Sequence, residues 1–269
     1  MKEIHCTVGI LTYNSEEVLE RCLQSLEGFS DIVIADGGST DNTIAIARKH
    51  NARIISQSNP GHPITDFALE RNILLRAANE RWFFYVDSDE IVTQALREDI
   101  RQVVEDPSSQ YGAYRVRYLK TNEDASKVYR TYKEYYQVRL CRTDVGATFV
   151  RKVHERLQLP PEVTVGQIEG PWYVLLDADD LSFSVFSEKA WKRTYMTAKS
   201  WQPKGPIDVL HRIILTPTTQ VLKSLTKIVV VKIRWGKDAI PTKYELLRVL
   251  YAVFLFIQHT KRLIVGRAF

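Results

Sequence analysis

The stretch Arg81-Trp82-Phe83-Phe84-Tyr85-Val86-Asp87-Ser88-Asp89-Glu90 begins with an apolar run of strand length and ends in three carboxylates. This pattern is typical of a buried parallel strand that delivers acidic side chains to the ligand-binding edge of an α/β sheet. Side chains two apart on extended backbone point the same way, so we expect Asp87 and Asp89 to approach one hard cation together. The alternative is an acidic turn before a helix at 93–104, because carboxylates favour a helix N-terminus.

Strands and helices alternate before this stretch. Strands are predicted at 4–12, 32–35 and 53–56, and helices after Ser15, at 43–50 and at 67–78. Four such units in about ninety residues predict an α/β fold with a mainly parallel, doubly wound sheet. Further along, 111–118 and 135–141 are predicted to form an antiparallel hairpin at the sheet edge.

Four short motifs lie near the predicted strand ends: Thr12-Tyr13-Asn14, Asp36-x-Gly38-Ser39-x-Asp41, Arg71-Asn72 and Asp87-x-Asp89. In this order they resemble the family-2 glycosyltransferases, and most of all the branch that builds bacterial lipopolysaccharide core, including core β-1,4-glucosyltransferases. Val153-His154-Glu155 and the C-terminal segment extend the resemblance over nearly the whole chain. The resemblance implies the A-type glycosyltransferase fold and an inverting sugar transfer from a nucleotide-sugar donor, with UDP as the expected nucleotide.

The resemblance also implies a nucleotide site. Its expected residues are Thr12, Tyr13, Asn14, Asp36, Gly38, Ser39, Arg71 and Asp87. Asp36 would accept the uracil N3–H, and the alternative is an aspartate that only organises a turn and a helix start. Thr12 and Tyr13 would hold the base, or else pack as ordinary strand-end residues. Arg71 would contact base or phosphates, whereas an arginine on a helix usually lies on a solvated face.

The same resemblance implies a metal site and a catalytic general base. Asp89 is expected to coordinate Mg²⁺ or Mn²⁺ between the two phosphates, with Asp87 holding ribose or metal-bound water. His154 would add an imidazole ligand and favour Mn²⁺, or else serve as a structural histidine. Glu155 is the expected general base for the acceptor hydroxyl, with Glu90 and Asp180 as runners-up.

Composition and charge limit the partners. The chain has 269 residues, a net charge of +5, and three cysteines without a C-x-x-C pair, which indicates neither a disulfide framework nor a zinc site. Residues 201–269 hold twelve Lys and Arg against three acids, so this segment carries +9 and the rest carries −4. Basic residues interleaved with long apolar runs favour an anionic membrane surface over nucleic acid.

The chain is therefore predicted to have a catalytic domain at 1–202 and a basic, amphipathic helical segment at 203–269. Lysines interrupt the apolar helical stretch at 207–233, and Glu245 and Arg248 interrupt the one at 244–263, so neither is expected to span a membrane. The alternative for the segment is a helical cap on the catalytic domain or a dimer interface. The N-terminus lacks a signal peptide, which predicts a cytoplasmic protein at the inner face of the cell membrane.

Three functions remain open. The first is metal-dependent transfer of a sugar to a lipid-linked glycan such as lipopolysaccharide core. The second is transfer to a polyprenyl phosphate, where a phosphate oxygen attacks and no strong base is needed. The third is a nucleotide-binding membrane adaptor without catalysis.

Overall fold

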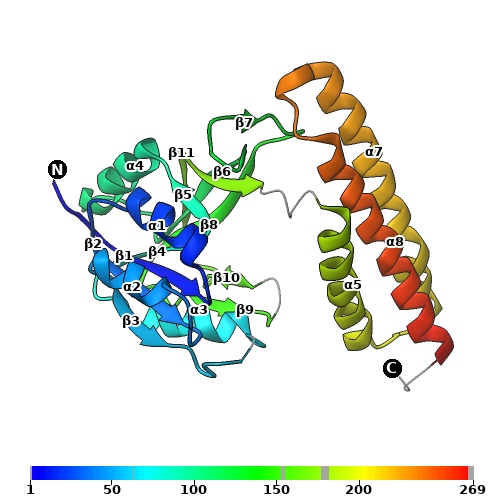
Figure 1. The fold of residues 1–269 in the computed structure, drawn as a ribbon, viewed down its shortest axis with the longest axis horizontal. Helices are drawn as coiled ribbons and strands as arrows, with labels where there is room; N and C mark the ends of the chain where they lie inside the picture. Colours follow the sequence, from blue (N-terminus) through cyan, green and yellow to red (C-terminus); the bar gives the residue numbers. More distant parts are fainter. Residues whose placement is uncertain (1, 63, 153–154, 177–181, 266–269) are drawn as a thin grey trace. The chain divides into compact units, whose positions relative to one another are not determined.

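The computed structural model describes residues 2–62, 64–152, 155–176 and 182–265 (Figure 1). The chain divides into two compact units. The first unit comprises Met1–Leu119 and Glu134–Val174, and the second comprises Lys120–Lys133 and Leu175–Phe269. The sequence predicted one boundary near residue 202, whereas the structure places the last one at 174–175 and assigns a hairpin tip to the second unit as well.

The first unit contains the expected parallel strands. They are, in sheet order, β3 (Arg53–Ser56), β2 (Phe29–Asp36), β1 (Ile4–Thr12) and β4 (Trp82–Asp87). Phe84 and Val86 of β4 pack into one hydrophobic core, while Phe83 and Tyr85 pack into the other. Because successive side chains of a strand face opposite ways, β4 is buried on both faces, as its unbroken apolar run predicted.

The other half of the sheet is antiparallel. It continues beyond β4 with β8 (Tyr135–Arg142), β6 (Ala113–Asn122), β11 (Val165–Leu176) and β5 (Glu90–Val92), and β7 (Val128–Tyr129) pairs with β6. The predicted hairpin is confirmed as the β6–β8 pair. Its predicted place at the edge is wrong, because β11 and β5 lie beyond it.

Strand β11 was not predicted from the sequence, and the reason lies in the residues of the strand itself. Its residues alternate between exposed and buried, but the buried positions include Gly166 and Gly170, which carry no apolar side chain. A Cβ at Gly166 would lie 2.5 Å from the Tyr114 ring, and one at Gly170 would lie 2.7 Å from the Leu96 backbone. Close packing therefore excludes the side chains that would have made the strand visible as a hydrophobic pattern.

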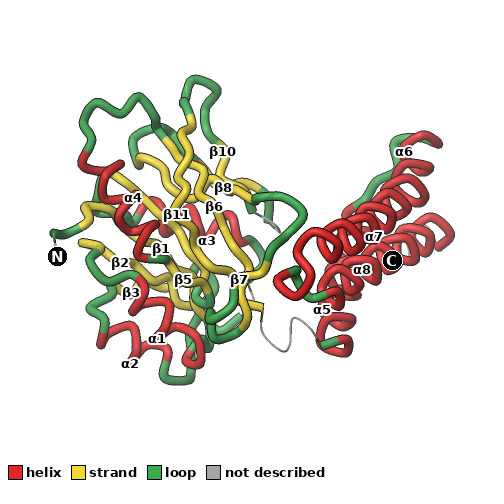
Figure 2. The backbone as a smooth tube through the Cα atoms, turned by 90° about the horizontal axis from the view of Figure 1, so that it is seen from above, coloured by secondary structure: helices red, strands yellow, loops and turns green. Residues whose placement is uncertain are grey.

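Helices cover both faces of this sheet (Figure 2). They are α1 (Glu16–Ser25), α2 (Thr43–Lys49), α3 (Phe67–Arg76) and α4 (Gln94–Glu105). Buried residues of α1 and α4 belong to one core and those of α3 to the other. Asp66 and Thr93 begin α3 and α4 by accepting hydrogen bonds from Leu69 N and Leu96 N. The α/β, doubly wound fold class is thus confirmed, with a mixed sheet.

A small antiparallel pair, β9 (Thr148–Val150) and β10 (Arg156–Gln158), lies apart from the main sheet. Asn72 of α3 holds β9, because its amide donates to Phe149 O at 2.9 Å and accepts from Phe149 N at 2.8 Å. This contact fixes β9, which pairs with β10, the strand that directly follows Glu155.

The second unit is helical. It contains α5 (Phe183–Ser200), α6 (Pro206–Leu210), a π-helical turn (His211–Leu215), α7 (Thr216–Trp235), a short 3₁₀ turn (Gly236–Asp238) and α8 (Thr242–Val265). Trp191 of α5 packs edge-on against Phe254 of α8, and Trp201 packs against His259. These aromatic contacts explain why α5 belongs to this unit. Within the described residues, no helix is both long and apolar enough to cross a bilayer.

Candidate functional site

The loops that follow β1 and β2 are bonded to each other. Asn14 N donates to Ser39 Oγ at 2.8 Å, and Thr40 N donates to Asn14 Oδ1 at 2.8 Å. Ser15 N donates to Thr43 Oγ1 at 2.7 Å. Asn14 adopts φ 47°, a left-handed conformation that asparagine tolerates. The first two motifs of the sequence therefore form one structure at the carboxyl edge of the parallel strands.

Asp36 lies at the centre of this structure and is only 6% exposed. Its carboxylate accepts from Thr12 Oγ1 at 3.0 Å, from Ser39 Oγ at 2.6 Å, and from the backbone N–H groups of Gly38 and Ser39 at 2.8 Å each. Four donors match the four lone-pair sites of a carboxylate. Asp36 thus organises the turn, and a ligand can reach its oxygens only if one donor turns away.

Tyr13 and Gln57 stand beside this turn. Tyr13 is half exposed, and its ring lies so close to Gly37 that a Cβ there would be 3.1 Å from Tyr13 Cδ2. Gln57 is buried and donates to Thr12 O at 3.1 Å and to Ala35 O at 3.0 Å. An exposed ring beside a backbone of small residues offers a stacking surface for a planar group.

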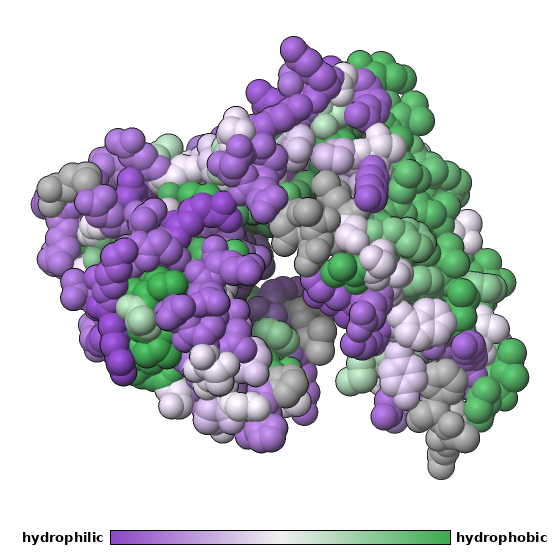
Figure 3. Space-filling view, in the orientation of Figure 1, coloured by the Kyte–Doolittle hydropathy of each residue, from purple (hydrophilic) through white to green (hydrophobic). Residues whose placement is uncertain are grey.

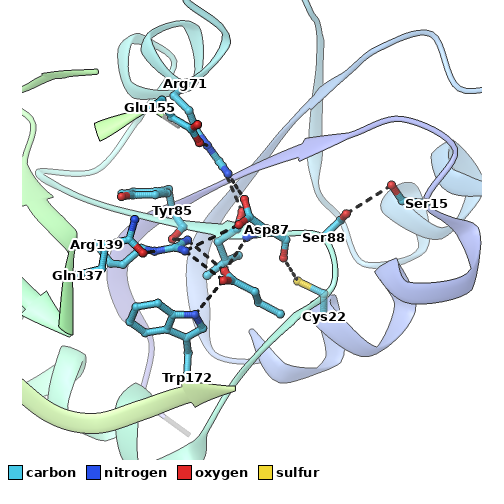
Figure 4. Close-up of polar contacts among 12 residues, drawn as sticks. Ser15, Cys22, Arg71, Tyr85, Asp87, Ser88, Gln137, Arg139, Glu155 and Trp172 are labelled. Carbon is cyan, nitrogen blue, oxygen red and sulfur yellow. Dashed lines mark hydrogen bonds and ion pairs between the residues drawn. The ribbon is translucent and has the colours of Figure 1, made fainter. Parts of the chain in front are cut away.

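A buried network of charges occupies the end of β4 (Figure 4). Arg71, which is 2% exposed, donates to the Asp87 carboxylate and, at 3.2 Å, to Val86 O. Arg139 of β8 lies 3.7 Å from the other oxygen of Asp87. The alternative that placed Arg71 on a solvated helix face is therefore wrong, because α3 turns this side chain toward the strand ends.

Glu90 anchors Arg139. The two guanidinium NH₂ groups of Arg139 donate to the two Glu90 oxygens at 3.0 Å each, and Trp172 Nε1 and Asp87 N donate to them at 2.9 Å. Desolvation and the nearby Asp87 charge raise the pKa of Glu90, but an ionised carboxylate is the form that accepts four donors. Glu90 is 4% exposed and all its acceptor positions are filled by donors of the protein, so we interpret it as a structural anion rather than a base.

Opposing effects act on Asp87. Desolvation alone would raise its pKa, but the attraction of Arg71 and Arg139 and their hydrogen bonds outweigh it and hold the pKa below its usual value. Tyr85 lies between the two guanidinium groups, 5.1 Å from Arg71 and 4.6 Å from Arg139. Burial raises the pKa of Tyr85 to about 12, so this ring is neutral at physiological pH.

Glu155 also faces Arg71. One of its carboxylate oxygens lies 3.6 Å from Arg71 Nε, and its side chain is 21% exposed. Arg71 Nε is buried and has no hydrogen-bond partner within the part of the chain that the structure describes. Arg71 thus contacts both Asp87 and Glu155, through its neighbouring Nη2 and Nε atoms. Figure 4 shows both carboxylates directed at it.

The acidic turn differs from the sequence-based expectation. Strand β4 ends at Asp87, and Ser88 and Asp89 form a turn before β5, so the alternation of side chains on extended backbone does not apply to Asp89. Asp89 is exposed, and Ser88 Oγ donates to Ser15 Oγ at 3.4 Å, which links this turn to the Asn14 loop. His154 and Asp180 lie outside the described residues.

The donor atoms of the turn suit a hard cation only in part. The exposed Asp89 and the partly exposed Asp87 offer carboxylate oxygens, the ligands that Mg²⁺ and Mn²⁺ accept. Among the described residues, however, no group of three or more His, Cys, Asp and Glu side chains could hold a metal by itself.

Sequence reasoning missed Gln57, Arg139 and Trp172. Arg139 stands in an otherwise apolar part of β8, and a charged residue in a buried strand is a usable signal of a buried partner. Trp172 lies on β11, the strand hidden by its glycines. Together, the parallel strand ends, the two buried guanidinium groups and the exposed acidic turn form a candidate site at the edge of the sheet where α/β proteins bind their ligands.

The family model for glycosyl transferase family 2 matches residues 7–156, and the chain belongs to this family. It is 30% identical over 171 residues to the lipopolysaccharide core biosynthesis glycosyltransferase LpsC of Rhizobium meliloti (strain 1021), a match that covers 58% of this chain and 57% of the relative. It is 26% identical over 98 residues to the SPbeta prophage-derived glycosyltransferase SunS of Bacillus subtilis (strain 168), covering 36% and 23%. The chain thus spans less than two thirds of these curated relatives.

Solved structures with a related arrangement include the mannosyltransferase PcManGT of Pyrobaculum calidifontis in complex with GDP-Man and Mn²⁺. It has a TM-score of 0.49 and 13% identity, covering 99% of this chain and 89% of that one. Another is S. aureus TarS in complex with UDP-GlcNAc, with a TM-score of 0.48 and 14% identity, covering 99% and 93%. The family match makes the chain a family-2 glycosyltransferase.

Proposed function

We propose that this glycosyltransferase is an inverting, metal-dependent enzyme that moves a sugar from a UDP-sugar to a lipid-linked glycan such as lipopolysaccharide core. The observation that carries the proposal is the position of Arg71 between Asp87 and Glu155, beside the exposed Asp89. Such a guanidinium group is suited to a diphosphate on one side and to an oriented carboxylate on the other. The sequence match to LpsC supports the choice of acceptor class.

The donor would bind at the Asn14 and Asp36 loops. Tyr13 would stack on the base, while Thr12, Asn14 and Gly38 shape the loop around it. Uracil N3–H would reach Asp36 by displacing the Ser39 hydroxyl, because a hydroxyl can rotate away and the backbone donors cannot. Ser39→Ala is then expected to keep UDP binding, and Asp36→Asn to lose it, measured by calorimetric titration.

A divalent cation would be held by Asp89 and the donor diphosphate, with Asp87 at ribose or at a metal-bound water and His154 as a further ligand. When bound, the cation neutralises the charge that grows on the departing diphosphate, an effect worth several kcal/mol. The oxygen ligands of the turn fit Mg²⁺ or Mn²⁺. The ion pair with Arg71 would keep Asp87 ionised for this task.

Glu155 would take the proton from the acceptor hydroxyl, on the face of the sugar opposite the diphosphate. Glu155→Gln keeps the shape and removes the base, so turnover is expected to fall by about 10²-fold or more while UDP binding stays unchanged. Transfer to a polyprenyl phosphate needs no strong base. Full activity of Glu155→Gln would therefore contradict the glycan acceptor and favour the polyprenyl phosphate.

The helical unit would hold the enzyme at an anionic membrane surface on the cytoplasmic side. The apolar flank of α7 consists of Leu222, Leu225, Val229 and Ile233, which are 59%, 45%, 56% and 81% exposed. In Figure 3 the hydrophobic residues gather along one side of this unit. An exposed apolar stripe with basic residues beside it is typical of helices that lie in the headgroup region. Leu222→Gln with Val229→Gln is expected to weaken binding to anionic vesicles.

The experiment that tests the donor site is titration of UDP into the full chain with and without Mn²⁺. Asp89→Ala is expected to abolish the metal-dependent part of the binding. Asp106→Ala is the matched control, because Asp106 is an exposed aspartate at the other end of α4 from the acidic turn. If wild type binds UDP equally well without a divalent cation, or if both variants behave alike, the proposed metal role is wrong.

A further inference from the structure

A cavity of about 310 Å³ opens within the helical unit, among α5, α7 and α8. Most of its exposed surface comes from apolar atoms, but polar and basic residues carry it: Gln220, Lys223, Ser224 and Lys227 of α7, Arg248 and Tyr251 of α8, and Phe186 of α5. The lining supplies three cationic groups and several neutral hydrogen-bonding groups. Such a set matches an oxyanion that needs both charge and several donors.

The charges around the cavity are unbalanced. In the portion of the chain described by the structure, Lys223 and Lys227 make no ion pair within 4.0 Å. The acid beside them is the buried Glu245, which lies 3.9 Å from Arg248 Nε and whose Oε2 accepts no hydrogen bond from the described residues. One carboxylate therefore faces three cations.

The environment of Lys227 shows the same imbalance. Desolvation lowers the pKa of its ammonium group, Glu245 opposes this, and the positive charges of Arg248, Lys133 and Lys223 lower the pKa further. Lys133 belongs to the hairpin tip that is part of the same unit. A doubly charged anion in the cavity would remove this repulsion.

The cavity and the apolar flank lie on different sides of α7. Helical residues are about 100° apart, so Lys223 and Lys227 fall on one side of the buried Ser224, and Leu222 and Val229 on the other. The cationic cavity is thus not simply the basic rim of the apolar flank. It is a separate concave site with its own donors.

We propose that this cavity binds a phosphate group, with Lys223, Lys227 and Arg248 as the charged donors and Tyr251 and Gln220 as neutral ones. The phosphate has two possible sources, a lipid headgroup or a soluble phosphate ester, and both offer the same recognisable chemistry. The site is independent of the transfer reaction. If the phosphate site proved wrong, the proposed glycosyl transfer would still stand. UDP titration tests the donor site separately and so distinguishes the failure of one proposal from the failure of the other.

The test compares two double variants of the full chain. Lys227→Gln with Arg248→Gln removes two charges from the cavity, and Lys232→Gln with Lys243→Gln removes two exposed charges from the same two helices outside it. Binding of inorganic phosphate and glycerol 3-phosphate is measured by calorimetry, and circular dichroism checks the fold. The cavity variant is expected to bind phosphate about tenfold more weakly or worse, the loss typical of one charge-assisted hydrogen bond.

Vesicles identify the source. Phosphatidylcholine vesicles that contain phosphatidic acid are compared with vesicles that contain phosphatidylserine, matched for surface charge. Preference for phosphatidic acid, lost only in the cavity variant, assigns the site to a lipid headgroup; loss confined to the soluble esters assigns it to a soluble phosphate. Equal phosphate affinity of both double variants, or no binding of phosphate by wild type, would overturn the proposal.

Discussion

Glu90→Gln tests the buried network most directly. Glu90 is 4% exposed and accepts from four donors, two of them on Arg139, which is 5% exposed. Glutamine has one acceptor oxygen, and its NH₂ group would face a donor. The change therefore removes the charge partner of a buried guanidinium group, whose next carboxylate, Asp87, lies 3.7 Å away.

Breaking one side of a buried ion pair costs about 3 to 5 kcal/mol, since the remaining charge stays desolvated. For a unit of this size, each kcal/mol lowers Tm by roughly 2 to 4 °C, so the expected decrease is about 6 to 20 °C. The control is Asp144→Asn, which removes the partner of Arg142 on the same strand in an exposed pair of 2.6 Å. Exposed pairs are worth about 0 to 1 kcal/mol.

The assay is thermal unfolding followed by tryptophan fluorescence, because Trp172 donates to Glu90 and reports on this region. The expected result is a large decrease in the unfolding midpoint for Glu90→Gln and little change for Asp144→Asn. If the two variants lost the same small amount, the network would not hold Arg139 as described, and the structural role of Glu90 would be refuted.

Three further predictions concern the first unit. Burial raises the pKa of all three cysteine thiols, so native protein at pH 8 is expected to react slowly with a thiol reagent and the urea-unfolded chain rapidly. Gly170→Ala is expected to cost about 1 to 3 kcal/mol by urea unfolding, since its Cβ would clash with the Leu96 backbone. Burial opposes ionisation of Asp31, but the hydrogen bonds and charge of Arg53 outweigh burial and lower the pKa of the carboxyl group. The ionised Asp31 therefore stabilises the folded protein above the pKa of the unfolded state, and this stabilisation is lost as the pH falls. Asp31→Asn is expected to make the free energy of unfolding depend less on pH in the acid range.

The parallel half of the fold could be predicted from the sequence because its signals are local. The aromatic run of β4, the glycines after β2 and the capping residue Thr93 each act within a few positions. The clustering of the Asn14 and Asp36 loops also followed from topology, because carboxyl ends of neighbouring parallel strands meet.

The buried ion pairs, strand β11 and the contacts of the hairpin tip could not be predicted, because they depend on residues that are far apart in the sequence. The Glu90–Arg139 pair joins residues 49 positions apart, and although a charged residue in a buried strand signals a buried partner, nothing in the segment around Arg139 identifies Glu90 as that partner. Strand β11 lacks a clear hydrophobic alternation because close packing at two of its inward positions, Gly166 and Gly170, leaves no room for a side chain. The contact between the hairpin tip and the C-terminal helices is also non-local: Lys127 Nζ donates to Lys237 O across 110 positions, and no local pattern predicts that contact.

The hairpin tip at Lys120–Lys133 gives the chain an interleaved connectivity, because it belongs to the helical unit while the strands on both sides of it belong to the first. Arg130 N donates to Asp238 O at 2.7 Å, and Ile240 N donates to Arg130 O at 3.0 Å. A deletion of the C-terminal helices would strip partners from this tip, so it would not be a clean removal of one part. Because segments of the two units alternate along the chain, no single cut separates one unit from the other.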